Sequence, residues 1–368
     1  MSSAVRGKTW RRGLVAAGSA GVAAAIAFTM QPATASPPEE SPSMGEAFSE
    51  AAAEYDVPRD LLVAVGYGET HLDGHNGKPS QDNGYGVMHL VSNPDRQSLE
   101  KAAKLTGESV KDLKNEDSVN IQGGAAVLRA HADALGLTAT EREDPANWYS
   151  AVARYAGASS PQLAKLYADN AYEILGEGVR ANPKGEGSVR TEAQRVSPDR
   201  GKYAKVGEVG TKSEDYPPAL WVPASESNYT AGRSADISQV VIHVTQGSYA
   251  GSISWFQNPE AQVSAHYVIR SSDGEVTQMV RDGDTAWHAR DANSSSLGIE
   301  HEGYVDDPSW FTDSMYQASA ALTKHLADTH GIPKDREHIV GHSEVPGNDH
   351  TDPGPNWDWD KYMGLVNG

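Results

Sequence analysis

Two histidines and several carboxylates crowd a short irregular stretch near the C-terminus, GHSEVPGNDHTDPGPNWDWDKY at 341–362. His342 and His350 lie eight residues apart there, among five acidic residues, three glycines and three prolines. Proline, glycine and aspartate are typical of turns, but a turn does not require imidazole. Imidazole and carboxylate groups bind metals and carry protons, so the stretch is a candidate for metal binding or acid–base chemistry.

A third histidine, His243, ends the apolar run VVIH, which indicates a buried strand. Polar side chains that follow a buried strand are well placed to point into a site. His243, one loop histidine and one carboxylate would make a three-ligand zinc site with a fourth position open for water, as a zinc hydrolase requires. Spacing alone does not choose among the loop candidates, which are His342, Glu344, Asp349, His350 and Asp352.

Short β-branched runs, bounded by Gly, Asp and Ser, predict the strands that carry these residues. They occupy 239–245, 264–270, 275–281 and 296–303, with a hairpin turn at 271–274. A short helix is expected at 251–259. A long one is expected from Thr312 or Asp313, either of which can cap it, to Gly331. Residues 216–368 are therefore expected to form an α/β domain with a mixed sheet.

The preceding part of the chain has a helical texture from 44 to 176 and is expected to be an all-α domain. Residues 177–215, rich in Gly, Pro, Lys and Glu, are expected to be a linker. Leu61, Val65 and Glu69 fall on one helix face, so Glu69 ends an apolar stripe. Desolvation there would raise its pKa and suit a general acid; the alternative is a helix-end glutamate in solvent.

The first 35 residues have the composition of a signal peptide, and a Pro/Ser/Glu tether follows at 36–43. Positive residues precede an apolar stretch that ends in Ala33-Thr34-Ala35. The Arg11-Arg12 pair leaves twin-arginine and general export both open, and a membrane anchor is the alternative. The mature chain is expected to be secreted, with no stable membrane insertion.

Composition excludes other partners and other ligands. A net charge of −19 and a pI near 5.0 argue against nucleic acid and against an anionic membrane surface. The chain has no cysteine, so disulfides are impossible and any metal site must use histidine and carboxylate.

Five motifs in order resemble a known family: VIHVT, SAHYVIR, TAWHA, SLGIE and GHSEVPGNDHTDPGP, within about 220–365. They are similar to the type 2 N-acetylmuramoyl-L-alanine amidases, whose fold is shared with peptidoglycan recognition proteins and T7 lysozyme-like amidases. This resemblance implies a zinc hydrolase acting on peptidoglycan. It implies His243, His342 and Asp352 as zinc ligands.

The same resemblance implies roles for the neighbouring residues. Glu300 falls on the acidic residue expected to act as general base. His350 falls where relatives carry a donor that stabilises the oxyanion, and as a histidine it makes that role sensitive to pH. His266 and His288 fall near the groove and are expected to support the ligands or contact substrate. Glu344 and Asp349 are then expected to be bystanders.

The helical part resembles the lysozyme-like domain of soluble lytic transglycosylases over about 44–176. The motifs are Glu69-Thr70, GYGVMHL, VNIQGGAAVL and AVARYAG. Two departures, His89 where that family has Gln and Ala156 where it has Asn, put glycan cleavage in doubt.

The sequence thus predicts a multidomain chain, with an all-α lysozyme-like domain followed by an α/β zinc amidase domain with a central mixed sheet. The predicted reaction is hydrolysis of the amide between N-acetylmuramic acid and the L-alanine of the stem peptide. Two alternatives stand beside it: glycan cleavage through Glu69, and peptidoglycan binding without catalysis.

Overall fold

The computed structural model describes residues 42–368 apart from 184 and 208. The predicted signal peptide and most of the predicted tether lie outside these described residues. Pro42–Gly368 form a single unit. None of the helices in the described part of the chain combines the length and the apolar character that crossing a membrane would need.

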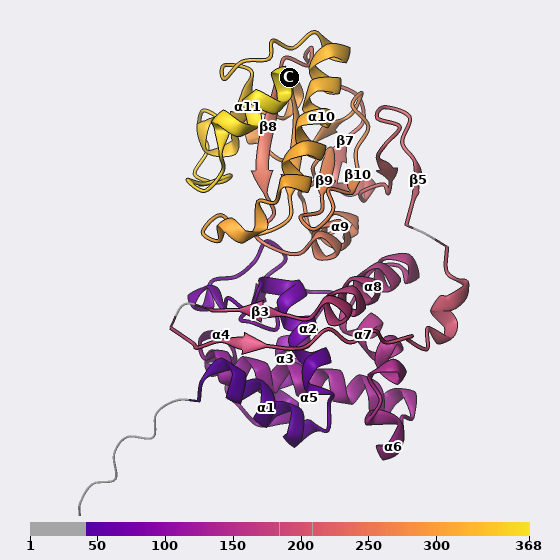
Figure 1. Ribbon diagram of the computed structural model, residues 1–368. Helices are drawn as coiled ribbons and strands as arrows, with labels where there is room; N and C mark the ends of the chain where they lie inside the picture. Colours follow the sequence, from indigo (N-terminus) through magenta and orange to yellow (C-terminus); the bar gives the residue numbers. More distant parts are fainter. Residues whose placement is uncertain (1–41, 184, 208) are drawn as a thin grey trace, which may run out of the picture. The chain divides into compact units, whose positions relative to one another are not determined.

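Helices dominate the first half of the described chain, drawn in indigo to magenta in Figure 1. They begin and end as local chemistry dictates: Ser43 and Glu46 form a capping box on the first helix, and Gly136, in the left-handed conformation, ends the fifth. The helices are α1 (Met44–Tyr55), α2 (Arg59–Thr70), α3 (Ser98–Thr106), α4 (Val110–Asn115), α5 (Asp117–Leu135), α6 (Ala139–Arg142), α7 (Tyr149–Tyr155) and α8 (Pro161–Glu177).

The longest helix, α5, packs against α1, α3, α4 and α7 and so forms the centre of the helical half. A small antiparallel hairpin, β1 (Gly84–Tyr85) and β2 (Leu90–Val91), interrupts the helices, so the half is not purely α. The hairpin loop comes so close to α5 that a Cβ on Gly124 would lie 2.5 Å from Cγ of Met88. A larger residue at this point of α5 would push the two apart.

The stretch expected to be a linker is packed for much of its length. It contains a hairpin of β3 (Arg180–Ala181) and β4 (Val189–Arg190) and a 3₁₀ turn at Gly201–Lys205. Val189 and Tyr203 are buried in the core of the helical half. Its Gly- and Pro-rich composition gave no sign of these anchors.

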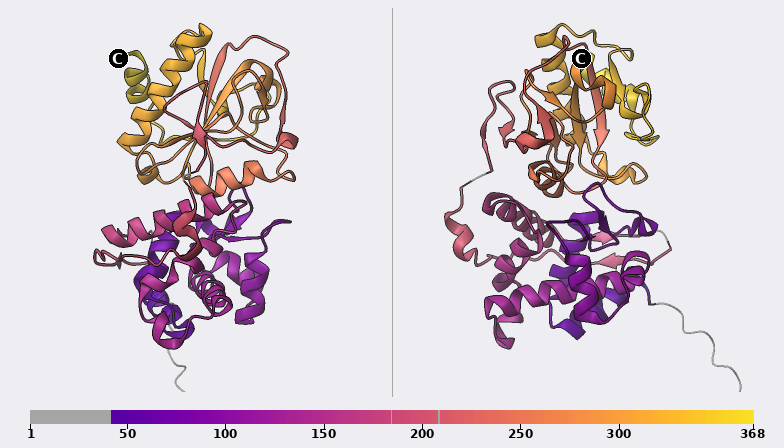
Figure 2. Two further views of the ribbon diagram at one scale, coloured as in Figure 1. Left: turned by 90° about the vertical axis from the view of Figure 1, so that its right-hand side faces the viewer. Right: turned by 180° about the vertical axis from the view of Figure 1, so that it is seen from behind.

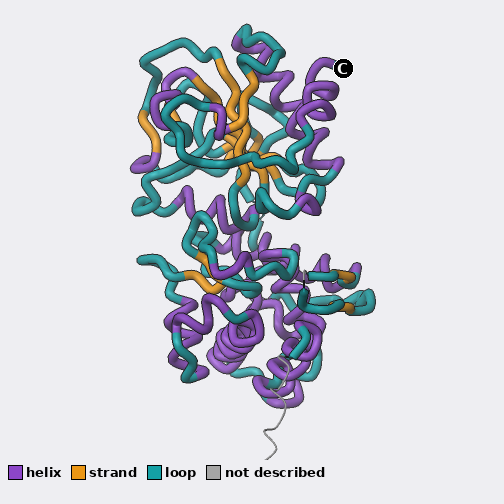
Figure 3. The backbone as a smooth tube through the Cα atoms, turned by 90° about the vertical axis from the view of Figure 1, so that its left-hand side faces the viewer, coloured by secondary structure: helices purple, strands orange, loops and turns teal. Residues whose placement is uncertain are grey.

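The mixed sheet that the sequence predicted forms the second half, and it has seven strands, one of them inside the stretch predicted to be a linker. Figure 3 shows these strands gathered at the centre of that half. Their spatial order is β13 (Ile339–Gly341), β8 (Gln239–Val244), β12 (Ser296–His301), β9 (Tyr267–Ile269), β10 (Val276–Gln278), β6 (Leu220–Trp221) and β5 (Thr211–Lys212). The predicted turn joins β9 to β10, which are antiparallel. Separately, β7 (Tyr229–Thr230) pairs with β11 (Thr285–Ala286).

Helices cover one face of this sheet (Figure 2). On that face α10 (Asp313–His330) and α11 (Trp359–Asn367) bury Val240 and Ile242 of β8 in a shared core. Val268 of β9, on the other face, packs against α9 (Tyr249–Gln257). Thr312 caps α10 by accepting a hydrogen bond from the Met315 amide. Because side chains alternate along a strand, His243 lies on the face of β8 opposite to α10.

Candidate active site

Parallel pairing brings the candidate site residues to one edge of the sheet. In the register of β8 with β13, Ile242 lies opposite Gly341, so His243 and His342 follow equivalent positions on neighbouring parallel strands. In the register of β8 with β12, His243 lies directly opposite Glu300. Carboxyl ends of parallel strands form the usual site edge of an α/β sheet. Residues far apart in the chain therefore meet here.

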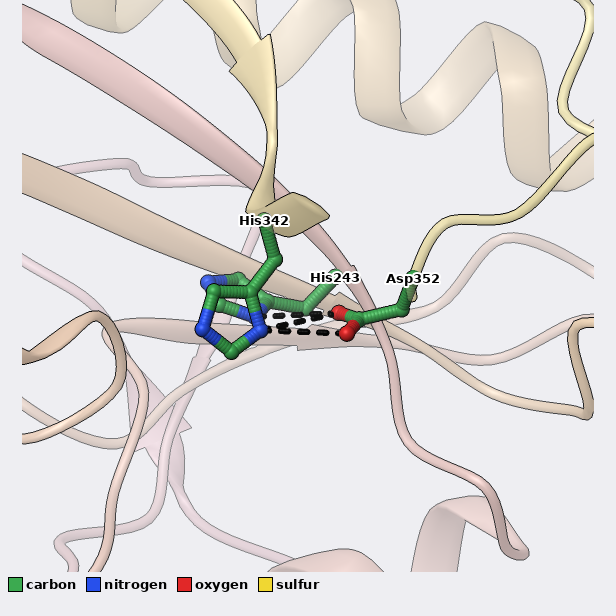
Figure 4. Close-up of side chains that lie close together, drawn as sticks. All are labelled: His243, His342 and Asp352. Atoms are coloured by element: carbon green, nitrogen blue, oxygen red, sulfur yellow. Dashed lines mark hydrogen bonds and ion pairs between the residues drawn. The ribbon is translucent and has the colours of Figure 1, made fainter. Parts of the chain in front are cut away.

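His243, His342 and Asp352 form a buried cluster whose side chains point toward one another (Figure 4). One ligand atom from each lies within 4.8 Å of the others. Nδ1 of His243 is 3.2 Å from Oδ2 of Asp352, and Nδ1 of His342 is 3.1 Å from Oδ1. Two imidazole nitrogens and one carboxylate that converge in this way are a donor set suited to zinc.

The protonation states of the cluster also suit a metal ion. Burial lowers the pKa of His243 to about 4, against the opposing effect of Asp352, so its imidazole is neutral near pH 7. Burial alone would raise the pKa of Asp352, but hydrogen bonds to His243 and His342 outweigh it and hold that pKa well below its usual range. Neutral imidazole and ionised carboxylate are the forms that bind metals.

His288 fixes the orientation of His243 from the side away from the cluster. Its Nδ1 lies 2.9 Å from Nε2 of His243, and its Nε2 lies 3.2 Å from Oγ of Ser296. A hydrogen bond on the outer nitrogen is what holds metal-binding histidines in place. Gly298 makes room for this ring, because a Cβ there would lie 2.5 Å from Nδ1 of His288. This explains the glycine in the SLGIE motif physically.

Glu300 lies beside the cluster and is almost fully buried. Burial and the nearby charge of Asp352 raise the pKa of Glu300 well above its usual range, while a hydrogen bond from the side chain of Gln81 lowers it. Its Oε2 is buried and has no hydrogen-bond partner among the described residues. A buried carboxyl oxygen without a partner is suited to take part in proton transfer.

The pocket at this edge has a volume of about 500 Å³ and is lined by both candidate ligand histidines, Asp352, Glu300 and His350. His350 is exposed, and its ring stacks on His342 with centroids 4.5 Å apart. Its Nδ1 is 3.9 Å from Oδ1 of Asp352. His350 therefore stands at the open side of the pocket, where it can reach a bound substrate.

His266 requires a correction, because it does not line this pocket. It is fully buried, its Nδ1 accepts a hydrogen bond from the Gly298 amide at 3.0 Å, and Arg233 Nη2 contacts its Nε2 at 2.8 Å. Both ring nitrogens are thus engaged inside the domain. The expected substrate contact is replaced by a structural role, while His288, the other residue of that pair, does line the pocket.

Glu344 and Asp349 remain apart from the three candidate ligands. Glu344 accepts a hydrogen bond from the Gly341 amide and pairs with Arg336, and Asp349 pairs with Arg290 at the surface. Sequence reasoning missed other residues of the pocket wall, which come from separate segments and, apart from Trp287 in TAWHA, lie outside the quoted motifs. They are Pro79, Ser80, Gln81, Gln262, Trp287, Arg290 and Asn293.

Glu69 in the helical half is closed off from solvent. Its exposure is 1%, Tyr167 donates a hydrogen bond to Oε1 at 2.7 Å, and Ser248 donates to Oε2 at 3.2 Å. Nδ1 of His89 lies 3.3 Å from Oε2. A substrate cannot reach this carboxyl group in the described arrangement.

The expected rise in the pKa of Glu69 is wrong. Burial alone would raise it, but the positive charge of His89, assisted by Arg96 and by the Tyr167 hydroxyl, outweighs burial and lowers the pKa. Burial would in turn lower the pKa of His89, yet Asp82 and Glu69 raise it to about 10. Glu69 is thus an ionised member of a buried charge cluster and not a protonated acid.

Comparison with known proteins shows the family of the chain. A family model described as N-acetylmuramoyl-L-alanine amidase matches residues 233–355. The chain is 44% identical over 171 residues to N-acetylmuramoyl-L-alanine amidase A of Achromobacter lyticus, covering 42% of this chain and 96% of that protein. It is 39% identical over 113 residues to the 1,6-anhydro-N-acetylmuramyl-L-alanine amidase AmpD of Escherichia coli K12, covering 28% of this chain and 59% of that protein.

A solved structure, a selenomethionine AmpD derivative, is 29% identical, with a TM-score of 0.36, over 42% of this chain and 98% of that chain. The two sequence comparisons define the chain as an enzyme of the amidase class. The chain belongs to the N-acetylmuramoyl-L-alanine amidase family.

Proposed function

We propose that this chain is an exported, zinc-dependent peptidoglycan hydrolase that cleaves the amide between N-acetylmuramic acid and the L-alanine of the stem peptide. The main observation behind this proposal is the buried cluster of His243, His342 and Asp352. These three residues and Glu300 line one pocket. The relatives are named as muramoyl-L-alanine or muramyl-L-alanine amidases, which supports the choice of this bond as the one that is cleaved. The composition of residues 1–35 supports export.

Zinc, when bound by the three residues, would act as a Lewis acid toward the amide carbonyl and lower the pKa of water. Glu300 takes up the proton of the attacking water and passes it to the leaving nitrogen. His350, at the open side of the pocket, donates an N–H toward the carbonyl oxygen as negative charge develops there. His288 holds His243 in its orientation throughout.

Product analysis on purified peptidoglycan tests the reaction. The expected products are free stem peptides with a new L-alanine amino terminus, together with glycan strands that keep their length. Glu69 is ionised and buried, so no anhydromuramic ends are expected. Mass spectrometry of the soluble and insoluble fractions distinguishes the two. Anhydromuramic ends without free stem peptides would favour glycan cleavage instead, and no products at all would favour a binding protein.

Replacing Glu300 by glutamine tests the proton carrier. The amide keeps the size of the side chain but cannot take up a proton, so kcat should fall by about 10²- to 10⁴-fold. Zinc content should stay at the wild-type level, because Glu300 is not one of the three clustered ligands. The change is measured as release of peptide from a soluble muramoyl-peptide. Wild-type kcat in this variant would assign the proton transfer to another group.

The helical half is proposed to hold the enzyme on glycan strands, and its resemblance to lysozyme-like domains stays a prediction. A pull-down of the full chain with Glu300 replaced by glutamine on insoluble peptidoglycan measures such binding separately from cleavage.

A further inference from the structure

One wall of the amidase pocket comes from the helical half. Pro79, Ser80 and Gln81 line the same 500 Å³ cavity as His243 and Glu300. The matched amidase family segment begins at residue 233, so this wall lies more than a hundred residues outside it. The segment that carries it, the wall loop 78–82, connects α2 to the hairpin of the helical half.

The wall loop and the residues just before it contact the amidase half directly. The Gln81 amide donates a hydrogen bond to the Gln246 carbonyl, which follows β8, at 3.3 Å. Just before the loop, the ring of His75 stacks on Tyr304 with centroids 3.7 Å apart and an interplanar angle of 16°. The ring of His71 stacks on Trp310 at 3.6 Å and 5°. Stacked rings and a backbone hydrogen bond fix the approach of the loop.

Buried polar groups of the helical half hold the wall loop from the other side. Oγ of Ser80 donates to Oδ1 of Asp82 at 2.6 Å and accepts from the Gly84 amide at 2.8 Å. Nε2 of His89 lies 2.8 Å from the same Oγ and 3.1 Å from Oδ1 of Asp82. The cluster that contains Glu69 therefore braces the loop, and the exposed Gln81 stands between two buried, hydrogen-bonded neighbours.

Gln81 and Glu300 line the same pocket, and interaction with the Gln81 side chain lowers the pKa of Glu300. The amide N–H can donate to a carboxylate, and Oε2 of Glu300 has no partner among the described residues. An amide donor in the wall of the same pocket is therefore available to orient a carboxyl group that has a partnerless oxygen. A misplaced carboxyl group would transfer its proton less often, because proton transfer requires a short and directed contact.

We propose that Gln81 is a positioning residue for Glu300, so that the helical half completes the amidase site and the buried Glu69 cluster serves to hold it there. The proposal rests on the proposed amidase function. It gives the helical half a part in the reaction itself, in addition to any hold on the polymer.

Two substitutions in the full-length protein test this role. Gln81→Ala removes the side chain, and Gln81→Glu keeps its size but removes the N–H donor. Both should lower kcat on a soluble muramoyl-peptide by about tenfold or more while KM changes by less than about twofold, because the group orients the proton carrier and does not bind substrate. A purely structural role would instead lower the melting temperature, which should stay at the wild-type value since Gln81 is exposed.

Gln317→Ala is the matched control, since Gln317 is exposed on α10 and lines none of the described pockets. Wild-type protein that releases no stem peptide would defeat the proposed function. Active wild-type protein with a kcat for Gln81→Ala equal to that of Gln317→Ala would defeat only the role of Gln81. Full kcat in Gln81→Glu would defeat it too, because the donor is absent there.

Discussion

Replacement of Asp352 by alanine is expected to reduce amidase turnover by at least about a thousandfold. The change removes one of three clustered ligands and leaves only His243 and His342. A Lewis acid at the reacting carbonyl is worth several kcal/mol, and each 1.36 kcal/mol corresponds to about tenfold in rate. The purified variant should also contain much less zinc than the wild type, as measured by elemental analysis.

Asp349→Ala provides the control for this experiment. Asp349 lies in the same loop, but its carboxylate is exposed and pairs with Arg290 at the surface. Zinc content should be the same as in the wild type. Removing zinc from wild-type protein with a chelator should lower turnover as far as Asp352→Ala does, and adding zinc back should restore only the wild type. Full activity in Asp352→Ala would show that the ligand set is different.

Replacement of His89 by glutamine is expected to destabilise the helical half strongly. His89 is the buried cation between Glu69 and Asp82, at 3.3 and 3.1 Å. Without it, two buried carboxylates lose the cation between them, and Arg96, which pairs with Asp82, is their main remaining compensation. Removing one partner of a buried ion pair costs about 3–5 kcal/mol of unfolding free energy. Urea denaturation followed by circular dichroism measures the loss.

The difference between this variant and the wild type should depend on pH. The pKa of His89 is raised to about 10 in the folded chain. Its contribution to the free energy of unfolding is therefore complete below its pKa in the unfolded chain, about 6.5, and is lost as the pH rises toward 10. The pKa of Glu69 is lowered, so its contribution is present above the unfolded value of about 4.3 and fades as pH falls. The destabilisation should therefore be largest between about pH 4.5 and 6.5.

His338→Gln is the matched control, since His338 is partly exposed and pairs with Asp335 at the surface. Exposed ion pairs contribute little, so its urea midpoint should equal that of the wild type. A midpoint for His89→Gln equal to this control would mean that His89 does not hold the buried cluster.

Much of the architecture follows from local sequence signals. The apolar run that ends at His243 is β8, the turn at 271–274 joins two antiparallel strands, and Thr312 caps α10. Such elements are predictable because periodicity, turn residues and caps act over a few neighbouring positions. The hairpin that contains Leu90 is too short to show a period, and the anchors Val189 and Tyr203 are single apolar residues in a polar stretch.

The sequence by itself determined which residue types were available for the chemistry. Without cysteine, a metal site had to use histidine and carboxylate, and the motifs marked His243, His342, Asp352 and Glu300. It could not decide between Asp352 and Asp349 from spacing, because a loop rich in proline and glycine has no fixed period. It also could not tell that His266 faces the interior while His288 faces the pocket.

Tertiary structure decided these points, because they depend on contacts between distant segments. Strand register places His243 opposite Glu300 and beside His342, and the final loop then brings Asp352 to both imidazoles. The pKa of Glu69 is lowered because the positive charge of His89, 20 residues further along the chain, outweighs the effect of burial. Only the folded chain brings such a charge within a few ångströms, where low solvent exposure makes it strong enough to reverse an expectation based on burial alone.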